Sequence, residues 1–385
     1  MACDTILSPS REERRVPVSK MHPINVFEYE QLARESLEPA NWDFFAGGSD
    51  DEITVRENCQ AFQRIKFLPR VLRDVRTVKM ETTVQGTRIS SPLLIAPTAY
   101  HCLAHPDGEL ATARAASNSK TMMIVSTFAS RRLEEIAAET AIPTSSKSQV
   151  GTDGTAVPLW FQLYPYRDLG LTKTLVQRAE ATGYQAIVLT VDVPRLGRRE
   201  RDIRNAFKLP QTIHLANFDD ALVSSQLDKP TGYIPEPIPV TWEIIAWLRS
   251  ITSLPIILKG ILAPPDALLA LEHGANALIV SNHGGRQLDS TLASIDALYP
   301  ITQVVAGRCE IYMDGGIRRG TDILKALALG ARAVLVGRPV IWGLAVNGAA
   351  GVEHVLELLS NELALAMTLA GCPDVEAIDR SLVVI

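Results

Sequence analysis

The chain of 385 residues lacks a long hydrophobic run and an apolar leader segment. Its longest apolar runs, such as ALIV at 277–280, are far shorter than the ~20 residues that a membrane-spanning helix needs. The opening stretch MACDTILSPSREERR has no apolar h-region, which argues against a secretory signal peptide. The sequence therefore predicts no membrane partner, and residues 1–20 are expected to form a mobile leader.

Paired cysteines and blocks of basic charge are also missing. The chain has five cysteines, an odd number, and no two of them form a CxxC motif. This usage fits free thiols in a reducing compartment better than a disulfide framework. Lys and Arg total 38 against 43 Asp and Glu, so the net charge is -5, and no basic block marks a nucleic-acid site. We expect a cytoplasmic protein that does not bind nucleic acid.

Eight short runs rich in Val, Ile and Leu are present from residue 91 onward, with helical segments between them. Continuous apolar runs are typical of strands that are buried on both faces, as in a parallel sheet. Their alternation with helices predicts an α/β fold, a (β/α)8 TIM barrel, with a doubly wound sheet as the alternative. The runs lie at 92–97, 121–126, 158–163, 186–192, 255–260, 277–282, 310–316 and 333–338.

The segment before the barrel, residues 24–90, is expected to form a cap. Residues 24–57 carry helical patterning, and Ser49 before three acidic residues predicts a helix start. The stretch VKMETTVQGTRI (78–89) alternates and predicts a small hairpin. The sequence therefore predicts an N-terminal cap of helices and a hairpin.

The step from the fourth run to the fifth is about twice as long as the other steps. Its insertion, residues 200–240, is rich in Pro, Asn and Asp and is expected to form a lid. The predicted organisation is one domain over 21–385, with the barrel at 91–345 and C-terminal helices at 346–385.

His283 and Arg286 lie three residues apart in the glycine-rich stretch SNHGGRQLD (281–289), which follows the sixth run. The catalytic groups of a barrel lie at the carboxyl ends of its strands. Histidine can take a proton near neutral pH, and arginine can hold a carboxylate by two hydrogen bonds. Asp192, at the end of the fourth run, could orient His283 and stabilise its cationic form.

Arg199 lies in the stretch TVDVPRLGRRERD (190–202), beyond the fourth run. It is a second candidate for holding a carboxylate. Arg201 and Asp202, in the same stretch, are expected on a solvated charged face.

Two glycine- and arginine-containing segments predict a phosphate site. DGGIRRGTD (314–322) follows the seventh run and VGRP (336–339) follows the eighth. Phosphate sites of barrels are commonly built by these two loops, where backbone N–H groups and a helix N-terminus donate hydrogen bonds. Arginine adds a planar charged fork.

These stretches resemble the FMN-dependent L-2-hydroxy acid oxidase/dehydrogenase family, which includes glycolate oxidase, lactate oxidase, mandelate dehydrogenase and hydroxymandelate oxidase. The resemblance covers roughly residues 24–380. It is carried by IAPTA (95–99), AHPDGELATARAAS (104–117), FQLY (161–164), LTVDVPRLGRRERDIRN (189–205), LKG (258–260), SNHGGRQLD (281–289), DGGIRRGTDILKALALGA (314–331) and VGRP (336–339).

The resemblance implies bound FMN and the oxidation of a 2-hydroxy acid of the lactate or mandelate type to the 2-oxo acid. As an oxidase, the enzyme would reduce oxygen to hydrogen peroxide. A dehydrogenase that uses a quinone or cytochrome, and a decarboxylating monooxygenase, are the alternatives. An FMN barrel isomerase or nucleotide-binding module is a further alternative, which His283, Arg286 and Arg199 disfavour. The family also implies a homotetramer and no metal ion.

The resemblance also assigns roles to catalytic and substrate-binding residues. His283 would be the base or hydride-transfer partner at the substrate 2-hydroxyl, with Asp192 as its charge partner. Tyr164 resembles a tyrosine that hydrogen-bonds the substrate. Arg199 and Arg286 would bind the substrate carboxylate.

The cofactor residues follow from the same resemblance. Lys259 would lie beside flavin N1 and O2, where a cation stabilises the reduced ring. The isoalloxazine and ribityl chain would contact Ala96, Pro97, Thr98, Ala99, Ser126, Gln162, Thr190, Ser281 and Asp314, and the phosphate would contact Gly315, Gly316, Arg318, Gly337 and Arg338.

Two aromatic positions depart from the family pattern. Phe44, in WDFFAGG (42–48), stands where the family often has a tyrosine whose hydroxyl reaches the substrate carboxylate. Phe128 stands where relatives have Trp or Tyr. The two phenylalanines could line an apolar pocket for a larger substrate side chain, or they could be neutral packing substitutions. The sequence leaves the particular 2-hydroxy acid open.

Overall fold

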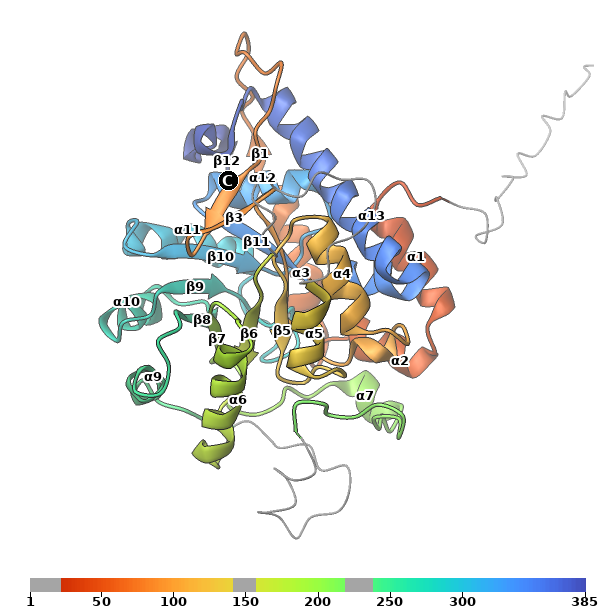
Figure 1. The fold of residues 1–385 in the computed structure, drawn as a ribbon. Coiled ribbons are helices and arrows are strands. Elements are labelled where there is room, and N and C mark those ends of the chain that lie inside the picture. Colours follow the sequence, from red (N-terminus) through yellow and green to blue (C-terminus); the bar gives the residue numbers. More distant parts are fainter. Residues whose placement is uncertain (1–21, 141–156, 219–237) are drawn as a thin grey trace, which may run out of the picture.

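A computed structural model of the protein describes residues 22–140, 157–218 and 238–385. Eight parallel strands form one sheet in the order β4-β11-β10-β9-β8-β7-β6-β5, which curls into a nearly closed barrel (Figure 1). Ile95 of β4 pairs with Met123, next to β5, and so links the two ends of the sheet. The strands are β4 (Leu93–Ile95), β5 (Ile124–Ser126), β6 (Trp160–Leu163), β7 (Ile187–Thr190), β8 (Ile256–Ile261), β9 (Ala277–Val280), β10 (Glu310–Asp314) and β11 (Ala333–Val336).

Each predicted run overlaps one of these strands, so the barrel prediction is confirmed and the doubly wound sheet is wrong. The runs read as continuously apolar because alternate residues of each strand face the barrel interior or the helices, and both sides are dry. Trp160, Tyr312 and Ile257 are fully buried inside the barrel.

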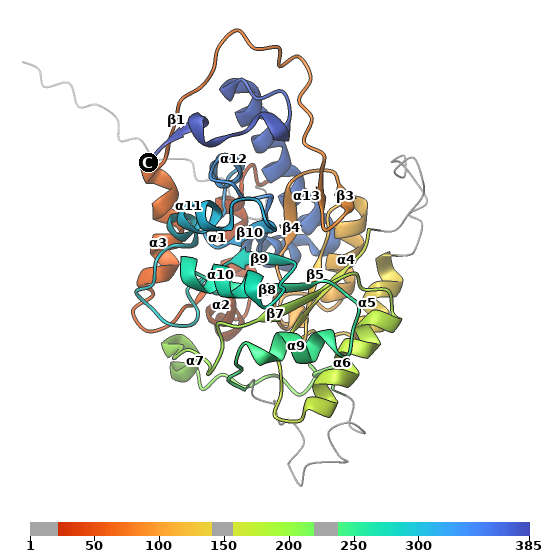
Figure 2. The ribbon, with the colours of Figure 1, turned by 90° about the vertical axis from the view of Figure 1, so that its left-hand side faces the viewer.

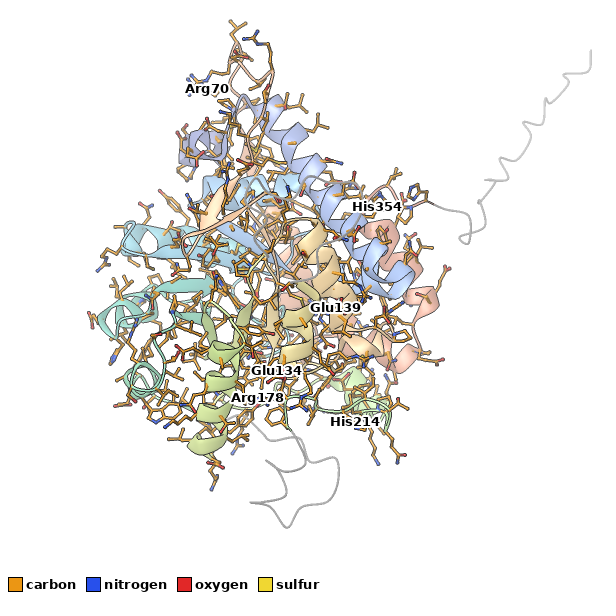
Figure 3. All side chains as sticks on the ribbon, in the orientation of Figure 1. Arg70, Glu134, Glu139, Arg178, His214 and His354 are labelled. Carbon is orange, nitrogen blue, oxygen red and sulfur yellow. The ribbon has the colours of Figure 1, made fainter. Side chains whose placement is uncertain are left out.

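Helices surround the barrel, as Figure 2 shows from a second side. Side chains join neighbouring helices: Arg178 and Glu134 point toward one another (Figure 3), with Nε 2.8 Å from Oε1. The helices that follow strands β4 to β11 include α4 (Glu109–Asn118), α5 (Leu133–Thr140), α6 (Leu169–Ala181), α9 (Glu243–Arg249), α10 (Pro264–Glu272), α11 (Ser294–Val305), α12 (Gly320–Ala328) and α13 (Arg338–Ala370).

The cap before the barrel consists of α1 (Val26–Ser36), α2 (Pro39–Ala46) and α3 (Ile53–Arg64), as predicted. The expected helix start at Ser49 is wrong, because α3 begins at Ile53. The preceding Glu52 has a left-handed φ of 57°, and Asp289 accepts the Ile53 N–H at 3.1 Å and the Thr54 N–H at 2.8 Å. A residue far along the chain therefore caps this helix.

The predicted hairpin is present as β2 (Thr82–Val84) and β3 (Thr87–Ile89), which pair in antiparallel fashion. Val84 and Ile89 are buried against the barrel interior at the amino ends of its strands. Because the hairpin closes this end, the carboxyl ends of the strands form the end that is available for a site.

The region after the barrel, predicted to consist of helices over 346–385, also contains 3-10 turns and a short strand. Helix α13 already begins at Arg338 and has non-helical backbone at Asn347 and Gly348. Two short 3-10 turns and strand β12 (Val383–Val384) follow, and β12 pairs with β1 (Lys66–Phe67), so the C-terminal end returns to the cap (Figure 2).

Only part of the predicted lid can be described, since 219–237 lie outside the described residues, as does the predicted leader 1–20. The visible part contains α7 (Glu200–Arg204). Arg201 lies 3.3 Å from Asp43 and 2.5 Å from Glu52, so it fastens α7 to the cap. The Arg201 side chain is 38% exposed, so it keeps contact with solvent as expected, but it also forms ion pairs that the expectation did not include. In the part of the chain that is described, no helix is long and apolar enough to cross a membrane.

Candidate active site

The site residues predicted for catalysis come together at the carboxyl ends of the strands. Tyr164 directly follows β6, Asp192 follows β7, and His283 follows β9. Lys259 lies within β8, and Asp314 is the last residue of β10. Residues far apart in the chain meet here because parallel strands place their carboxyl ends at one end of a barrel.

His283 and Asp192 form the centre of this group. Nδ1 of His283 lies 3.0 Å from Oδ1 of Asp192. The His283 backbone has a left-handed φ of 58°, and its N–H donates to the Ser281 hydroxyl at 3.0 Å. With Nδ1 engaged, Nε2 faces the Tyr164 hydroxyl at 3.5 Å. This arrangement leaves Nε2 as the atom that can exchange a proton.

Burial and charge set the protonation of the pair. Burial lowers the pKa of His283, Asp192 raises it, and Lys259 lowers it again, with a lowered pKa as the result. Burial opposes ionisation of Asp192, but His283 and Lys259 bring its pKa below the usual range. The ground state is therefore a neutral imidazole beside a carboxylate, which is the state that a general base requires.

Lys259 is a buried cation with two partners. Its Nζ lies 3.0 Å from Oδ2 of Asp314 and donates to the Ser281 hydroxyl at 2.8 Å. Burial opposes its charge, but Asp314 and Asp192 raise the pKa of the ammonium above its usual value. The second oxygens of both aspartates are buried and have no hydrogen-bond partner within the described chain. Buried acceptors of this kind suit a ligand with hydroxyl or N–H donors.

A second hydrogen-bond network links three neighbouring strand ends. Gln162 accepts a hydrogen bond from the Ser126 hydroxyl at 3.2 Å and donates one to the Thr190 hydroxyl at 3.0 Å. The Phe128 N–H in turn donates to the Ser126 hydroxyl at 3.1 Å. All three polar side chains are buried, so the network holds them in a fixed arrangement.

Two arginines approach the same end of the barrel. Arg286 donates to the carbonyls of Phe44 at 2.6 Å and Gly47 at 2.9 Å, and its guanidinium lies 5.2 Å from the Phe44 ring centroid. Arg199 lies 3.9 Å from Asp202, and its Nε is buried without a partner in the described structure. Burial lowers the pKa of both guanidinium groups, and their mutual repulsion lowers that of Arg286 further. An anion would relieve this repulsion.

The predicted phosphate loop has the backbone that such a loop needs. Gly315 and Gly316 have φ values of 100° and 84°, and a Cβ at Gly316 would lie 1.9 Å from the Asn58 carbonyl oxygen. Arg318 is buried; its N–H donates to Asp322 at 3.0 Å. These glycines allow the loop to pack directly on α3.

The Arg338 guanidinium, expected to contact the phosphate, forms hydrogen bonds to backbone carbonyl groups. Its side chain donates to the carbonyls of Phe45, Gly284 and Gly47, each at 2.9 Å. Its guanidinium therefore joins the cap to the loop of His283. Gly337 precedes it as the N-cap of α13, so backbone N–H groups at this helix start are further donors for a phosphate.

The loop after β4 meets this helix start. The Ala96 N–H donates to the Val336 carbonyl at 2.9 Å. A Cβ at Gly337 would make ordinary van der Waals contacts with Thr98 Oγ1 at 3.6 Å and Ala96 Cβ at 3.7 Å, so the backbone at this position is not crowded. Pro97 and Ala99 belong to the same loop and are half-buried. A ligand phosphate could approach the backbone here.

Aromatic rings form one wall of the site, and the sequence signalled only part of it. Phe44 stacks on Phe207 with centroids 4.9 Å apart and lies 5.8 Å from Tyr100. Phe128 lies 5.3 Å from Tyr164 and 6.1 Å from Phe218. Tyr100 directly follows the IAPTA motif, which is the one signal that could have pointed to it.

This arrangement defines a class of protein. A barrel that combines a histidine–aspartate pair, a buried lysine and a glycine loop beside a helix start is built for a phosphate-bearing flavin. The chemistry of the donor set fits FMN: the unpaired oxygen of Asp314 suits ribityl hydroxyls, Lys259 suits the ring and backbone N–H groups suit the phosphate. The protein is thus a flavin-dependent barrel oxidoreductase.

Comparisons with known proteins agree with this class. The model of the FMN-dependent dehydrogenase family matches residues 33–385. L-lactate oxidase of Nostoc sp. is 50% identical over 369 residues, which cover 93% of this chain and 97% of that protein. Glycolate oxidase of Spinacia oleracea is 46% identical, over 94% of this chain and 95% of that protein. A solved structure of mandelate oxidase is 44% identical, has a TM-score of 0.83 and covers 94% of this chain and 98% of its own.

The chain therefore belongs to the FMN-dependent dehydrogenase family. It is an FMN-dependent oxidoreductase of the 2-hydroxyacid oxidase type, as the resemblance implied.

Proposed function

We propose that the site oxidises an L-2-hydroxy acid at C2, with His283 as the base, Arg199 and Arg286 as the carboxylate site and oxygen as the electron acceptor. One observation carries this proposal. His283, paired with Asp192 at 3.0 Å, shares the same end of the barrel with Arg199 and Arg286, two partly buried arginines whose charges are incompletely neutralised. A 2-hydroxy acid needs both a base at its hydroxyl and cations at its carboxylate.

His283 takes the proton of the substrate hydroxyl at Nε2. Asp192 accepts a hydrogen bond from Nδ1 of His283. This bond fixes the orientation of the ring, and the carboxylate stabilises the imidazolium that forms. Tyr164 lies 3.5 Å from the same nitrogen and, since burial raises its pKa, stays a neutral donor beside it. The Tyr164 hydroxyl can therefore hydrogen-bond the substrate oxygen as the proton leaves.

The carboxylate is held by Arg199 and Arg286. Arg286 already uses NH1 on two backbone carbonyls, which fixes its position and leaves the rest of its guanidinium for the substrate. Among the described residues, Asp202, at 3.9 Å, is the one acidic side chain that pairs with Arg199. A bound carboxylate would neutralise both groups and hold C2 in place.

When bound, FMN supplies the two-electron redox chemistry. Lys259 would place a positive charge beside the ring system, and Gln162, Ser126, Thr190 and Ser281 would hydrogen-bond it. Asp314 would bind ribityl hydroxyls, and the phosphate would meet the backbone of Gly315, Gly316, Gly337 and Arg338 together with Arg318.

The substrate carries an apolar group at C2. The rings of Phe44, Tyr100 and Phe128 form an aromatic wall in which Phe128 lies 5.3 Å from Tyr164. Such a wall favours the methyl group of lactate or the phenyl group of mandelate over the hydrogen of glycolate. L-lactate oxidase and mandelate oxidase are among the similar proteins.

The test is anaerobic flavin reduction followed in a stopped-flow instrument. L-Lactate and (S)-mandelate are expected to bleach the flavin at lower concentration than glycolate, and admitted air should restore its colour with formation of hydrogen peroxide. Slow reoxidation by air would refute oxygen as the acceptor. Failure of all three acids to bleach the flavin would refute the proposed reaction.

His283→Ala tests the base. The variant should keep FMN, because His283 is not among the proposed cofactor contacts, and should lose reduction by substrate. Turnover at the level of the unaltered protein would refute the assignment. A homotetramer and a cytoplasmic location complete the proposal; equilibrium sedimentation and fractionation of the source cells would test them.

A further inference from the structure

Tyr100 contributes its ring to the aromatic wall of the site, but the proposed reaction gives its hydroxyl no role. Tyr100 is buried, directly follows the IAPTA stretch and has a left-handed backbone φ of 57°. A bulky residue adopts this conformation only where its surroundings hold it. The Tyr100 N–H donates to the Phe128 carbonyl at 3.1 Å, and its carbonyl accepts the Leu103 N–H at 2.9 Å. These two bonds fix the direction of the side chain.

The ring of Tyr100 stands between the two phenylalanines that depart from the family pattern. Its centroid lies 5.8 Å from that of Phe44 and 6.1 Å from that of Phe128. Phe44 in turn lies under the guanidinium of Arg286, at 5.2 Å. Tyr100 therefore borders the carboxylate site on the side where Phe44 has no hydroxyl.

The Tyr100 hydroxyl has no hydrogen-bond partner among the described residues, although the side chain is buried. The positive charge of Arg199 lowers the pKa of Tyr100, and Tyr100 in turn raises the pKa of both Arg199 and Tyr164. Burial raises its pKa far above the usual value, so the hydroxyl stays protonated and can only donate toward an anion. An unpaired donor beside Arg199 is suited to a carboxylate.

We infer that Tyr100 is a further substrate-binding residue, whose hydroxyl donates a hydrogen bond to the substrate carboxylate in place of the hydroxyl that Phe44 lacks. This inference rests on the proposed function. It assigns the carboxylate three donors from three parts of the chain: Arg286 from the loop after β9, Arg199 from the segment before α7, and Tyr100 from the loop after β4.

Tyr100→Phe removes only the hydroxyl and keeps the ring. The KM for L-lactate and the Kd of pyruvate, measured by its perturbation of the flavin absorbance, should both rise about tenfold or more, the loss expected for one hydrogen bond to a charged group. The rate of flavin reduction at saturating lactate should stay within about threefold, since the base is unchanged. The double variant Tyr100→Phe with Phe44→Tyr should recover most of the binding.

Tyr166→Phe is the matched control. Tyr166 is another buried tyrosine with an unpaired hydroxyl, but it packs against Phe218 and has no ring contact with Phe44. Its variant should bind pyruvate normally. An unchanged Kd and KM in Tyr100→Phe, with normal reduction of the unaltered protein by lactate, would overturn the inference and leave the proposed function standing. A fall in the saturating reduction rate with unchanged KM would also overturn it, because the hydroxyl would then act at C2.

Discussion

Asp192→Asn separates the charge of Asp192 from its shape. In the unaltered protein Nδ1 of His283 lies 3.0 Å from the Asp192 carboxylate; the amide of the variant can still accept this hydrogen bond, but it no longer stabilises the imidazolium. Two unit charges about 4 Å apart interact by about 4 kcal/mol at an effective dielectric constant near 20. At 1.36 kcal/mol for each factor of ten, the rate of flavin reduction should fall by roughly a thousandfold.

The pH dependence of flavin reduction in the same variant is an independent test, because it predicts the direction in which the acidic limb of the profile moves. The base works when neutral, so the reduction rate falls as the pH drops through the pKa of His283. Asp192 raises that pKa against the lowering effects of burial and Lys259. Without the carboxylate the pKa falls further, and the acidic limb of the profile should move to lower pH while the maximum rate drops.

The assay is anaerobic stopped-flow reduction between about pH 5 and 9, with FMN content checked by absorbance. Asp289→Asn is the matched control, because Asp289 lies in the same loop as His283 but caps α3 through the Ile53 N–H. The control should reduce at the normal rate. A fully loaded Asp192→Asn protein that loses less than about tenfold, or whose acidic limb moves to higher pH, would refute the role given to the charge.

Two further predictions concern the cofactor site. Lys259→Met leaves Asp314 as an unpaired buried carboxylate, so the unfolding free energy should drop by about 3–5 kcal/mol and FMN should dissociate on gel filtration; a normal melting temperature with retained FMN would contradict this. Gly316→Ala places a methyl group 1.9 Å from the Asn58 carbonyl oxygen, and it should lower both the melting temperature and the FMN affinity. Gly86→Ala, also at positive φ but with no atom within 4 Å, shows how much of that loss is backbone strain alone.

The strands were predictable because burial on both faces leaves a direct mark in the sequence. Every run of Val, Ile and Leu overlaps its strand, and the disagreement is confined to the ends: β7 covers only Ile187–Thr190 of the run 186–192, and β8 extends to Ile261, one residue beyond the run 255–260. The start of α3 was not predictable in this way. Its cap is Asp289, more than two hundred residues later, and no local pattern around Ser49 encodes that contact.

The residues of the site also differ in how well the sequence predicts their positions and contacts. His283, Asp192 and Lys259 could be placed from the sequence because they stand at strand ends, where topology decides which groups meet. Arg201 and Arg338 were harder, since their partners belong to the cap and its loops. From its charge alone, Arg201 is expected to face solvent and Arg338 is expected to bind a phosphate. The structure shows an ion pair with Asp43 and hydrogen bonds to backbone carbonyls.

The distribution of partners explains how an acidic chain can hold two anions at one end of its barrel. Lys259 is neutralised by Asp314 at 3.0 Å, whereas Arg338 is satisfied by carbonyl groups, which carry no net charge. In the described part of the chain, the acidic group that Arg199 and Arg286 share is Asp202, which lies 3.9 Å from Arg199. Positive charge is therefore left uncompensated in two places, near the carboxylate site and near the start of α13. These are the two places where the proposed reaction needs an anion, the substrate carboxylate in the first and the FMN phosphate in the second.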